Sequence, residues 1–277
     1  MSIDGADIIG SDSAYDIHNF IIEGWKDGKP IADLLTEVRG WEKDFCFNAR
    51  ETEIYWTALA FSLWKIGQLP DDVRDKALHL IAKGACADWL EIDPKAPKDR
   101  QKYLDKLAKK ISGPNLRPLA RPKLPKTLKQ PFFAIGDVVA VALPDGQYSA
   151  CILVQLDQTP RKIEYNFAIV NLMQSTLPTL DDVANAEISA KGISKASDAC
   201  WFCASCWTNH KTVGQVLPHL QRIGQVELKP GGMGCYAPGL GVDGFFRCWD
   251  SYFMSQNCHP MKDCIKKIVS EGAVKSA

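Results

Sequence analysis

The chain has 277 residues, of which 46% are hydrophobic and 24% charged, and its formal net charge is zero. This length suffices for one large domain or two ordinary ones, and the composition excludes a disordered chain. Zero net charge also excludes a general attraction to nucleic acid or to anionic membranes.

The N-terminal segment reads MSIDGADIIGSDSAYD and lacks the basic and apolar regions of a signal peptide. No stretch has the roughly 18–20 apolar residues that are needed to cross a bilayer. We therefore expect a cytoplasmic protein without membrane contact. Its ten cysteines are expected to stay reduced there.

The first part of the chain, residues 1–112, has the apolar periodicity of a helical domain. Within residues 48–66, Trp56, Leu59 and Leu63 recur at intervals of three or four and form one helix face. Helices are predicted near 13–26, 30–40, 48–66, 70–84 and 97–111.

Residues 113–131 read GPNLRPLARPKLPKTLKQP and contain five prolines, five basic residues and no acid. Repeated proline fixes φ and removes backbone donors, so this stretch is expected to run extended. We interpret it as a Pro-rich basic linker between the helical domain and a second domain at 132–277.

Charge is distributed unevenly along the chain. Acids exceed bases by about eight in residues 1–75, and bases exceed acids by about eight in residues 101–130. An acidic face of this kind is either ordinary solvated surface or a docking site for a basic partner.

The second domain has the period-two patterns and β-branched runs that are typical of strands. Residues 132–157 contain two apolar runs around Asp145-Gly146, which predicts a β-hairpin because this pair accepts positive φ. The expected fold class is therefore α+β, with a helical domain followed by a small bent β-sheet or SH3-like barrel that carries one or two helices. Three further elements are predicted in it: strands at 163–172 and 223–228, and a short helix at 181–188.

The segment ACWFCASCWTNH, residues 199–210, has cysteines at zinc-like spacing. On a helix these cysteines and the histidine fall on one side, and reduced cysteine packs as a small apolar side chain. A zinc site requires four ligands, usually from two separate pairs, and no clean second pair is present. The favoured interpretation is therefore a buried helix face. The alternatives are a reactive thiol or a metal site formed by Cys200, Cys203, Cys206 and His210.

Residues 239–244, GLGVDG, match the dinucleotide motif GxGxxG, but only 33 residues follow them. That length leaves no room for a dinucleotide-binding fold, so the glycines are expected to serve tight turns. The chain contains no serine elbow, HExxH motif or Walker loop. We therefore expect no catalytic residues, no cofactor and no enzymatic activity.

Two stretches resemble known families. IGDVVAVALPDGQYSACILVQLD, with YNFAIVNL after it, resembles the immunity proteins of bacterial polymorphic-toxin systems, which are contact-dependent or type VI secretion systems. ETEIYWTALAFSLWKIGQLPDDVRDKALHLI is similar to a small bacterial helical domain of unknown function. The resemblance implies a cytoplasmic antitoxin that binds a cognate toxin and occludes its active site. It assigns no functional residues, because the matching motifs are structural, and the cysteine segment and basic linker depart from the pattern.

An antitoxin is expected to bind its partner through exposed acids and aromatic residues. A metal- or thiol-dependent module centred on residues 200–210 is the second hypothesis. An adaptor for a peptide or nucleic acid is the third, with a protein favoured over nucleic acid as the partner. The candidate partner-binding residues are Asp71, Asp72, Asp145, Tyr148, Tyr236, Trp249 and Tyr252.

Overall fold

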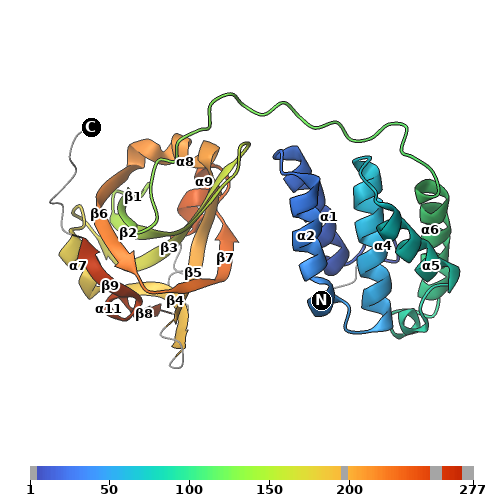
Figure 1. Cartoon of the computed structure of the whole chain (residues 1–277). Coiled ribbons are helices and arrows are strands. Elements are labelled where there is room, and N and C mark those ends of the chain that lie inside the picture. The colour runs from blue at the N-terminus through green and yellow to red at the C-terminus, as the bar shows by residue number, and fades with distance from the viewer. Residues whose placement is uncertain (1–4, 195–198, 250–257, 270–277) are drawn as a thin grey trace. The chain divides into compact units, whose positions relative to one another are not determined.

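The computed structural model describes residues 5–194, 199–249 and 258–269. The chain divides into two compact units, Met1–Leu124 and Pro125–Ala277, and each is described here by itself (Figure 1). None of the helices in these described ranges combines the length and apolar character that crossing a bilayer requires.

The first unit is helical, and every helix predicted for it is present (Figure 1). The central helix is α4, whose side chains are buried over most of its length because α1, α5 and α6 pack around it. Its N-terminus is capped by Asn48, whose Oδ1 accepts the amide of Glu51 at 2.8 Å. The elements are α1 (Asp12–Lys26), α2 (Ile31–Gly40), α3 (Glu42–Phe45), α4 (Ala49–Lys65), α5 (Asp71–Ala82), η1 (Ala87–Glu91) and α6 (Ala96–Ile111).

The first part of the proline-rich stretch lies along this helical unit. The indole of Trp25 donates to the carbonyl of Leu119 at 3.2 Å, and the amide of Leu119 donates to the carbonyl of Lys65 at 2.8 Å. The guanidinium of Arg121 stacks over the ring of Trp25, 3.9 Å from its centroid. These contacts tie residues 113–124 to the helices.

The second unit is built on a nine-stranded sheet that curls into a half-barrel (Figure 1). Its strand order is β7-β5-β4-β3-β2-β1-β6-β9, with β8 beside β4. Among the described strands, β5 and β7 pair in parallel and the other pairs are antiparallel. The strands are β1 (Asp137–Ala142), β2 (Tyr148–Gln158), β3 (Ile163–Gln174), β4 (Glu187–Ser194), β5 (Ala199–Asn209), β6 (Leu220–Leu228), β7 (Gly231–Pro238), β8 (Cys258–Pro260) and β9 (Ile265–Val269).

Short helices cover both faces of this sheet, more of them than the one or two that the sequence predicted. One apolar cluster includes Val139 and Phe167 and is covered by α8 and α9. The other includes Val138 and Ala168 and is covered by α7 and α11. Burial on both faces explains why β1, β2 and β3 read as nearly continuous apolar runs. The helices are α7 (Leu180–Asn185), α8 (His210–Val216), η2 (Leu217–His219), α9 (Gly241–Arg247) and α11 (Met261–Cys264).

The expected α+β class is confirmed, as are the hairpin around Asp145-Gly146 and the strands at β3 and β6. The helix expected across residues 199–210 is wrong, because this segment forms strand β5. Phe167 pairs with Cys206 and Ala168 with Ala204, so β5 carries a β-bulge between Ala204 and Cys206, the last of its three cysteines.

Candidate functional site

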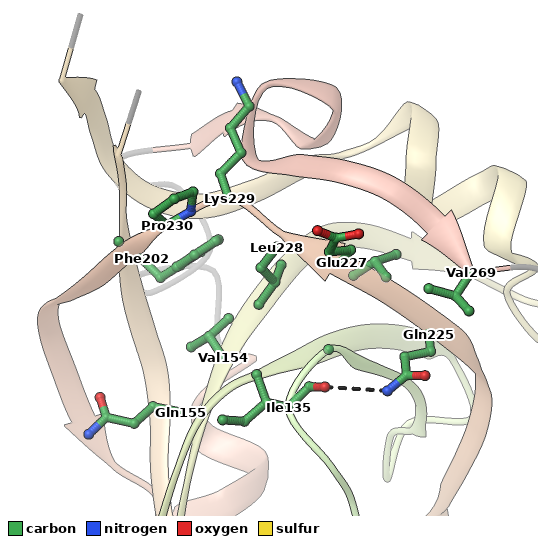
Figure 2. A pocket seen from close by; sticks show the side chains of 13 residues that line it. Ile135, Val154, Gln155, Phe202, Gln225, Glu227, Leu228, Lys229, Pro230 and Val269 are labelled. Carbon is green, nitrogen blue, oxygen red and sulfur yellow. Dashed lines mark hydrogen bonds between the residues drawn. The ribbon is translucent and has the colours of Figure 1, made fainter. Parts of the chain in front are cut away.

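One hollow of the β unit lies at the mouth of the half-barrel and has a volume of about 630 Å³ (Figure 2). Its wall combines the segment before β1, the middle of β2, one residue of β5, the end of β6 and the turn into β7. The side chains of Val154, Phe202 and Leu228 point into it (Figure 2). Segments far apart in sequence thus meet around one apolar space.

Backbone hydrogen bonds hold the segment before β1 between β2 and β6. The amide of Gly136 donates to the carbonyl of Leu153, and the carbonyl of Gly136 accepts the amide of Val226, both at 2.8 Å. A Cβ on Gly136, where φ is +87°, would overlap the carbonyl oxygen of Val226. Glycine is therefore required at this close approach. The neighbouring Ile135 projects outward and is 53% exposed at the rim.

Polar side chains lie around the apolar centre. Gln225 donates from Nε2 to the carbonyl of Ile135 at 3.4 Å, so its amide is held against the wall (Figure 2). Glu227 forms a 3.6 Å ion pair with Lys266 on β9. An apolar hollow of this volume with a few polar groups at its rim is suited to binding an apolar group. The sequence pattern does not mark Gln225 and Glu227 as a site; it predicts only that they lie on a strand at 223–228.

β5 places Cys200 and Cys206, two of the predicted metal ligands, on opposite faces of the sheet. Cys200 and Cys206 are both fully buried, yet they belong to the two different apolar clusters. The bulge between them reverses which face of the sheet the later cysteine points to. The side chain of Cys203 lies outside the described residues. Among the residues that are described, no group of three or more Cys, His, Asp or Glu could hold a metal ion.

His210 and Tyr165 hold Phe132, in the segment that leads into β1, against the β unit. Its Nδ1 lies 2.9 Å from the hydroxyl of Tyr165, and the ring of Phe132 stacks on the imidazole with centroids 4.3 Å apart. The amide of Phe132 donates to the same hydroxyl at 3.0 Å. Burial, with a smaller effect of Lys129, lowers the pKa of His210, which keeps the ring neutral at pH 7. These contacts give His210 a structural role, and we call Phe132, Tyr165 and His210 together the latch around His210.

Two of the predicted partner-binding acids, Asp71 and Asp72, lie exposed at the N-terminus of α5. Asp71 is 2.6 Å from Arg74, and Asp72 pairs with Arg39 on α2. Acids in a first turn interact favourably with the helix dipole. Both carboxylates therefore have local partners, and their contact with a protein partner stays a prediction.

A second hollow, of about 440 Å³, brings together Asp145 and Trp249 from opposite ends of the β unit's sequence. Asp145 accepts the amide of Gln147 at 3.0 Å within the hairpin turn. Trp249 is only 4% exposed, and its ring packs on Phe245 with centroids 5.1 Å apart. It is a core residue and not the exposed anchor that a partner-binding role requires.

The structure says little about the three remaining aromatic candidates, which are tyrosines. Tyr148 begins β2 beside the hairpin turn and is partly buried. The side chain of Tyr236 and the whole of Tyr252 lie outside the described residues. Partner binding by these three tyrosines stays a prediction.

The GLGVDG segment directly follows strand β7, and its last four residues form the start of helix α9. That helix has only seven residues. The amide of Gly239 donates to the carbonyl of Trp207 at 2.7 Å, and a Cβ on this glycine would lie 2.6 Å from the sulfur of Cys206. The close packing explains the glycine at this position without a nucleotide.

Comparison of the chain with protein-family models, with curated protein sequences and with solved structures gives no match.

Proposed function

We propose that the chain is a binding protein that takes an apolar anchor side chain of another protein into the hollow at the mouth of the half-barrel. The observation that carries this proposal is the combination of an apolar hollow with an exposed aliphatic rim. Ile135 is 53% exposed, and Val269 on β9, which also lines the hollow, is 36% exposed. Contiguous exposed apolar surface of this kind is typical of interaction sites.

The apolar lining of the hollow favours an aromatic or branched aliphatic anchor. Phe202 and Val226 at its floor are almost fully buried, at 4% and 5%, so the apolar floor is already formed before binding. Anchors that fill preformed apolar pockets supply much of the affinity at protein interfaces. The rim groups Gln225, Glu227 and Lys229 would then lie around the anchor and restrict its orientation.

The partner that we propose is the cognate toxin domain of a bacterial polymorphic-toxin system, and the chain is its cytoplasmic immunity protein. The resemblance of residues 135–157 and 165–172 to such immunity proteins supports this assignment. Binding would occlude the active site of the toxin, without a membrane or nucleic acid as partner. In the same proposal, residues 113–131 link two domains, 1–112 and 132–277, and the second is an SH3-like barrel.

The test is binding to the protein encoded by the adjacent upstream gene, measured by calorimetry with the full chain and scored in cells by rescue from toxicity. Ile135→Asp and Val269→Asp are expected to weaken binding at least tenfold, because a charge at the rim opposes burial of an apolar anchor. Leu116→Asp is the matched control, since Leu116 is 89% exposed on the helical unit. Binding that is equally tight in all three variants, or no binding and no rescue by the parent chain, would reject the proposal.

The metal-dependent alternative for Cys200, Cys203, Cys206 and His210 has its own test. Elemental analysis of protein purified without an affinity tag measures bound zinc and iron directly. A structural metal site retains close to one equivalent through purification, because the bound metal contributes to folding. The thiol-dependent alternative is favoured by a separate observation, which concerns Cys200 and a cysteine distant from it in sequence.

A further inference from the structure

Two cysteines that are 64 positions apart in sequence meet behind the wall of the hollow. The sulfur of Cys200 on β5 lies 3.0 Å from the sulfur of Cys264 at the end of α11. A disulfide bond is about 2.05 Å long, so these sulfurs must approach by about 1 Å to become bonded. Both residues are fully buried in the same apolar cluster.

The turn from β6 to β7 connects the backbones of these two cysteines. The amide of Cys200 donates to the carbonyl of Pro230 at 2.8 Å, and the amide of Lys229 donates to the carbonyl of Cys264 at 3.1 Å. A Cβ on Gly231 would overlap the carbonyl oxygen of Cys200, so the backbones of β7 and β5 are in direct contact at this point. The same turn forms part of the wall of the hollow (Figure 2).

We propose that Cys200 and Cys264 are a redox-active pair, oxidised to a reversible disulfide by low-molecular-weight disulfides, and that the bond locks the β6–β7 wall of the hollow. The proposal does not depend on the identity of the protein partner. It concerns the chemistry of the pair and the mobility of the wall.

The chemistry divides into two exchange steps. The thiolate of Cys200 attacks one sulfur of the oxidant, forms a mixed disulfide and releases one thiolate, which takes the proton of Cys264. The thiolate of Cys264 then attacks the sulfur of Cys200 and expels the second thiolate. Overall, one small disulfide is reduced to a thiol and a thiolate while the two cysteines become one disulfide.

The local electrostatics assign these roles. The hydrogen bond with Cys264 lowers the pKa of the Cys200 thiol and outweighs the opposing effect of burial, and Lys229 also lowers it, whereas the same contact raises the pKa of Cys264. Cys200 is therefore the attacking thiolate and Cys264 the resolving thiol. On the other face of the sheet, burial raises the pKa of Cys206 and of Cys151. Those cysteines serve as internal controls.

Both sulfurs are buried, so oxidation requires a local opening of the β6–β7 turn or of α11. The reaction is therefore expected to be slow and to follow the rate of this opening. Once formed, the disulfide removes the opened states, because it connects β5 directly to the segment that carries α11 and β9. The wall of the hollow loses mobility as a result.

The experiment incubates the full chain with oxidised glutathione and maps the product under non-reducing conditions by mass spectrometry. Trypsin releases residues 196–211 with three cysteines, and chymotrypsin cuts after Trp201 and so separates Cys200 from the other two. The expected product joins this fragment to the one that carries Cys264, and dithiothreitol reverses it. Cys264→Ser should stop at a glutathione adduct on Cys200, while Cys206→Ser should still form the cross-link.

Hydrogen exchange tests the second half of the proposal. Amides of Lys229 and Gly231 are expected to exchange at least tenfold more slowly in the oxidised chain than in the reduced chain. The pair would be shown to be inert if both cysteines were still fully alkylated on denaturation, after a chain that circular dichroism shows to be folded had been incubated with the oxidant, or if other cysteines were cross-linked instead. A cross-link without slower exchange would overturn the locking of the wall. The mapping of the parent chain needs no variant, so a misfolded serine variant does not affect it.

Discussion

Glu53 and Arg100 form a fully enclosed ion pair in the helical unit. Nε of Arg100 lies 2.7 Å from Oε1 of Glu53, and the two side chains are 0% and 4% exposed. The remaining polar atoms also have partners: Glu53 accepts from Cys86 and Trp89, and Arg100 donates to Thr57. The network joins α4, η1 and α6 in the core of this unit.

Breaking this pair from one side is expected to destabilise the helical unit strongly. Glu53→Gln removes the carboxylate that contacts the buried guanidinium of Arg100, which costs about 3–5 kcal/mol in the free energy of unfolding. Urea unfolding of the full chain measures the change. Asp99→Asn, which breaks an exposed pair with Lys102, is the matched control and should leave the unfolding midpoint unchanged. Equal effects of the two variants would contradict the role of the buried network.

His18 is expected to make the helical unit sensitive to mild acid. Burial, with smaller effects of Lys65 and Lys26, lowers the pKa of His18 from 6.5 to about 4. Its Nδ1 lies 2.9 Å from the hydroxyl of Ser62, which itself donates to the carbonyl of Ala58, so the neutral ring donates to Ser62. The unfolded chain binds a proton below pH 6.5 and the folded chain does not. Stability present above pH 6.5 is therefore lost progressively as the pH falls toward 4.

Two measurements check this prediction. NMR titration of the imidazole of His18 should give a pKa near 4. Urea unfolding at pH 7 and pH 5 should show a smaller loss of stability in His18→Gln than in the parent chain. His79→Gln is the control, because His79 is exposed on α5. A titration of His18 at its ordinary value would remove the basis of the prediction.

The helical half was predictable because its signals are local. Each helix carries its own apolar stripe and its own terminal residues, such as the Asn48 cap, and neighbouring helices merely bury what the stripe already specifies. The hairpin around Asp145-Gly146 was predictable for the same reason, since Gly146 has a φ of +84° in the turn.

β5 was mispredicted because its spacing fits two structures at once. Cysteines at intervals of three fall on one side of a helix, yet a strand with a bulge buries Cys200 and Cys206 on opposite faces of a sheet. The pairing with β3 and β7 decides between them, and it depends on residues distant in sequence. The hollow was not predictable for a related reason: Ile135, Val154 and Leu228 meet only when the sheet curls.

Alanine substitutions at two glycines with the same backbone conformation distinguish the cost of backbone strain from the cost of crowding in the wall of the hollow. Gly136 and Gly146 have φ values of +87° and +84°, but a Cβ would overlap the carbonyl oxygen of Val226 only at Gly136. Gly146→Ala is expected to cost about 1 kcal/mol from backbone strain alone. Gly136→Ala should cost about 3 kcal/mol, because β6 must also move. Urea unfolding followed by circular dichroism measures both, and similar values would show that the wall is loosely packed.

The latch around His210 gives the last prediction. Tyr165→Phe removes the acceptor of the Phe132 amide and the partner of His210 together, which is expected to cost about 1–3 kcal/mol because the amide loses its hydrogen bond. Residues before Phe132 should then detach locally, so trypsin should cleave after Lys129 faster than in the parent chain, before the β unit unfolds. Tyr148→Phe is the matched control, since Tyr148 makes no side-chain hydrogen bond within the described part of the chain. If cleavage after Lys129 were unchanged in Tyr165→Phe, the hydroxyl would not hold this segment, and the stacking of Phe132 on His210 and the hydrogen bond from Gln158 to the carbonyl of Lys129 would hold it instead.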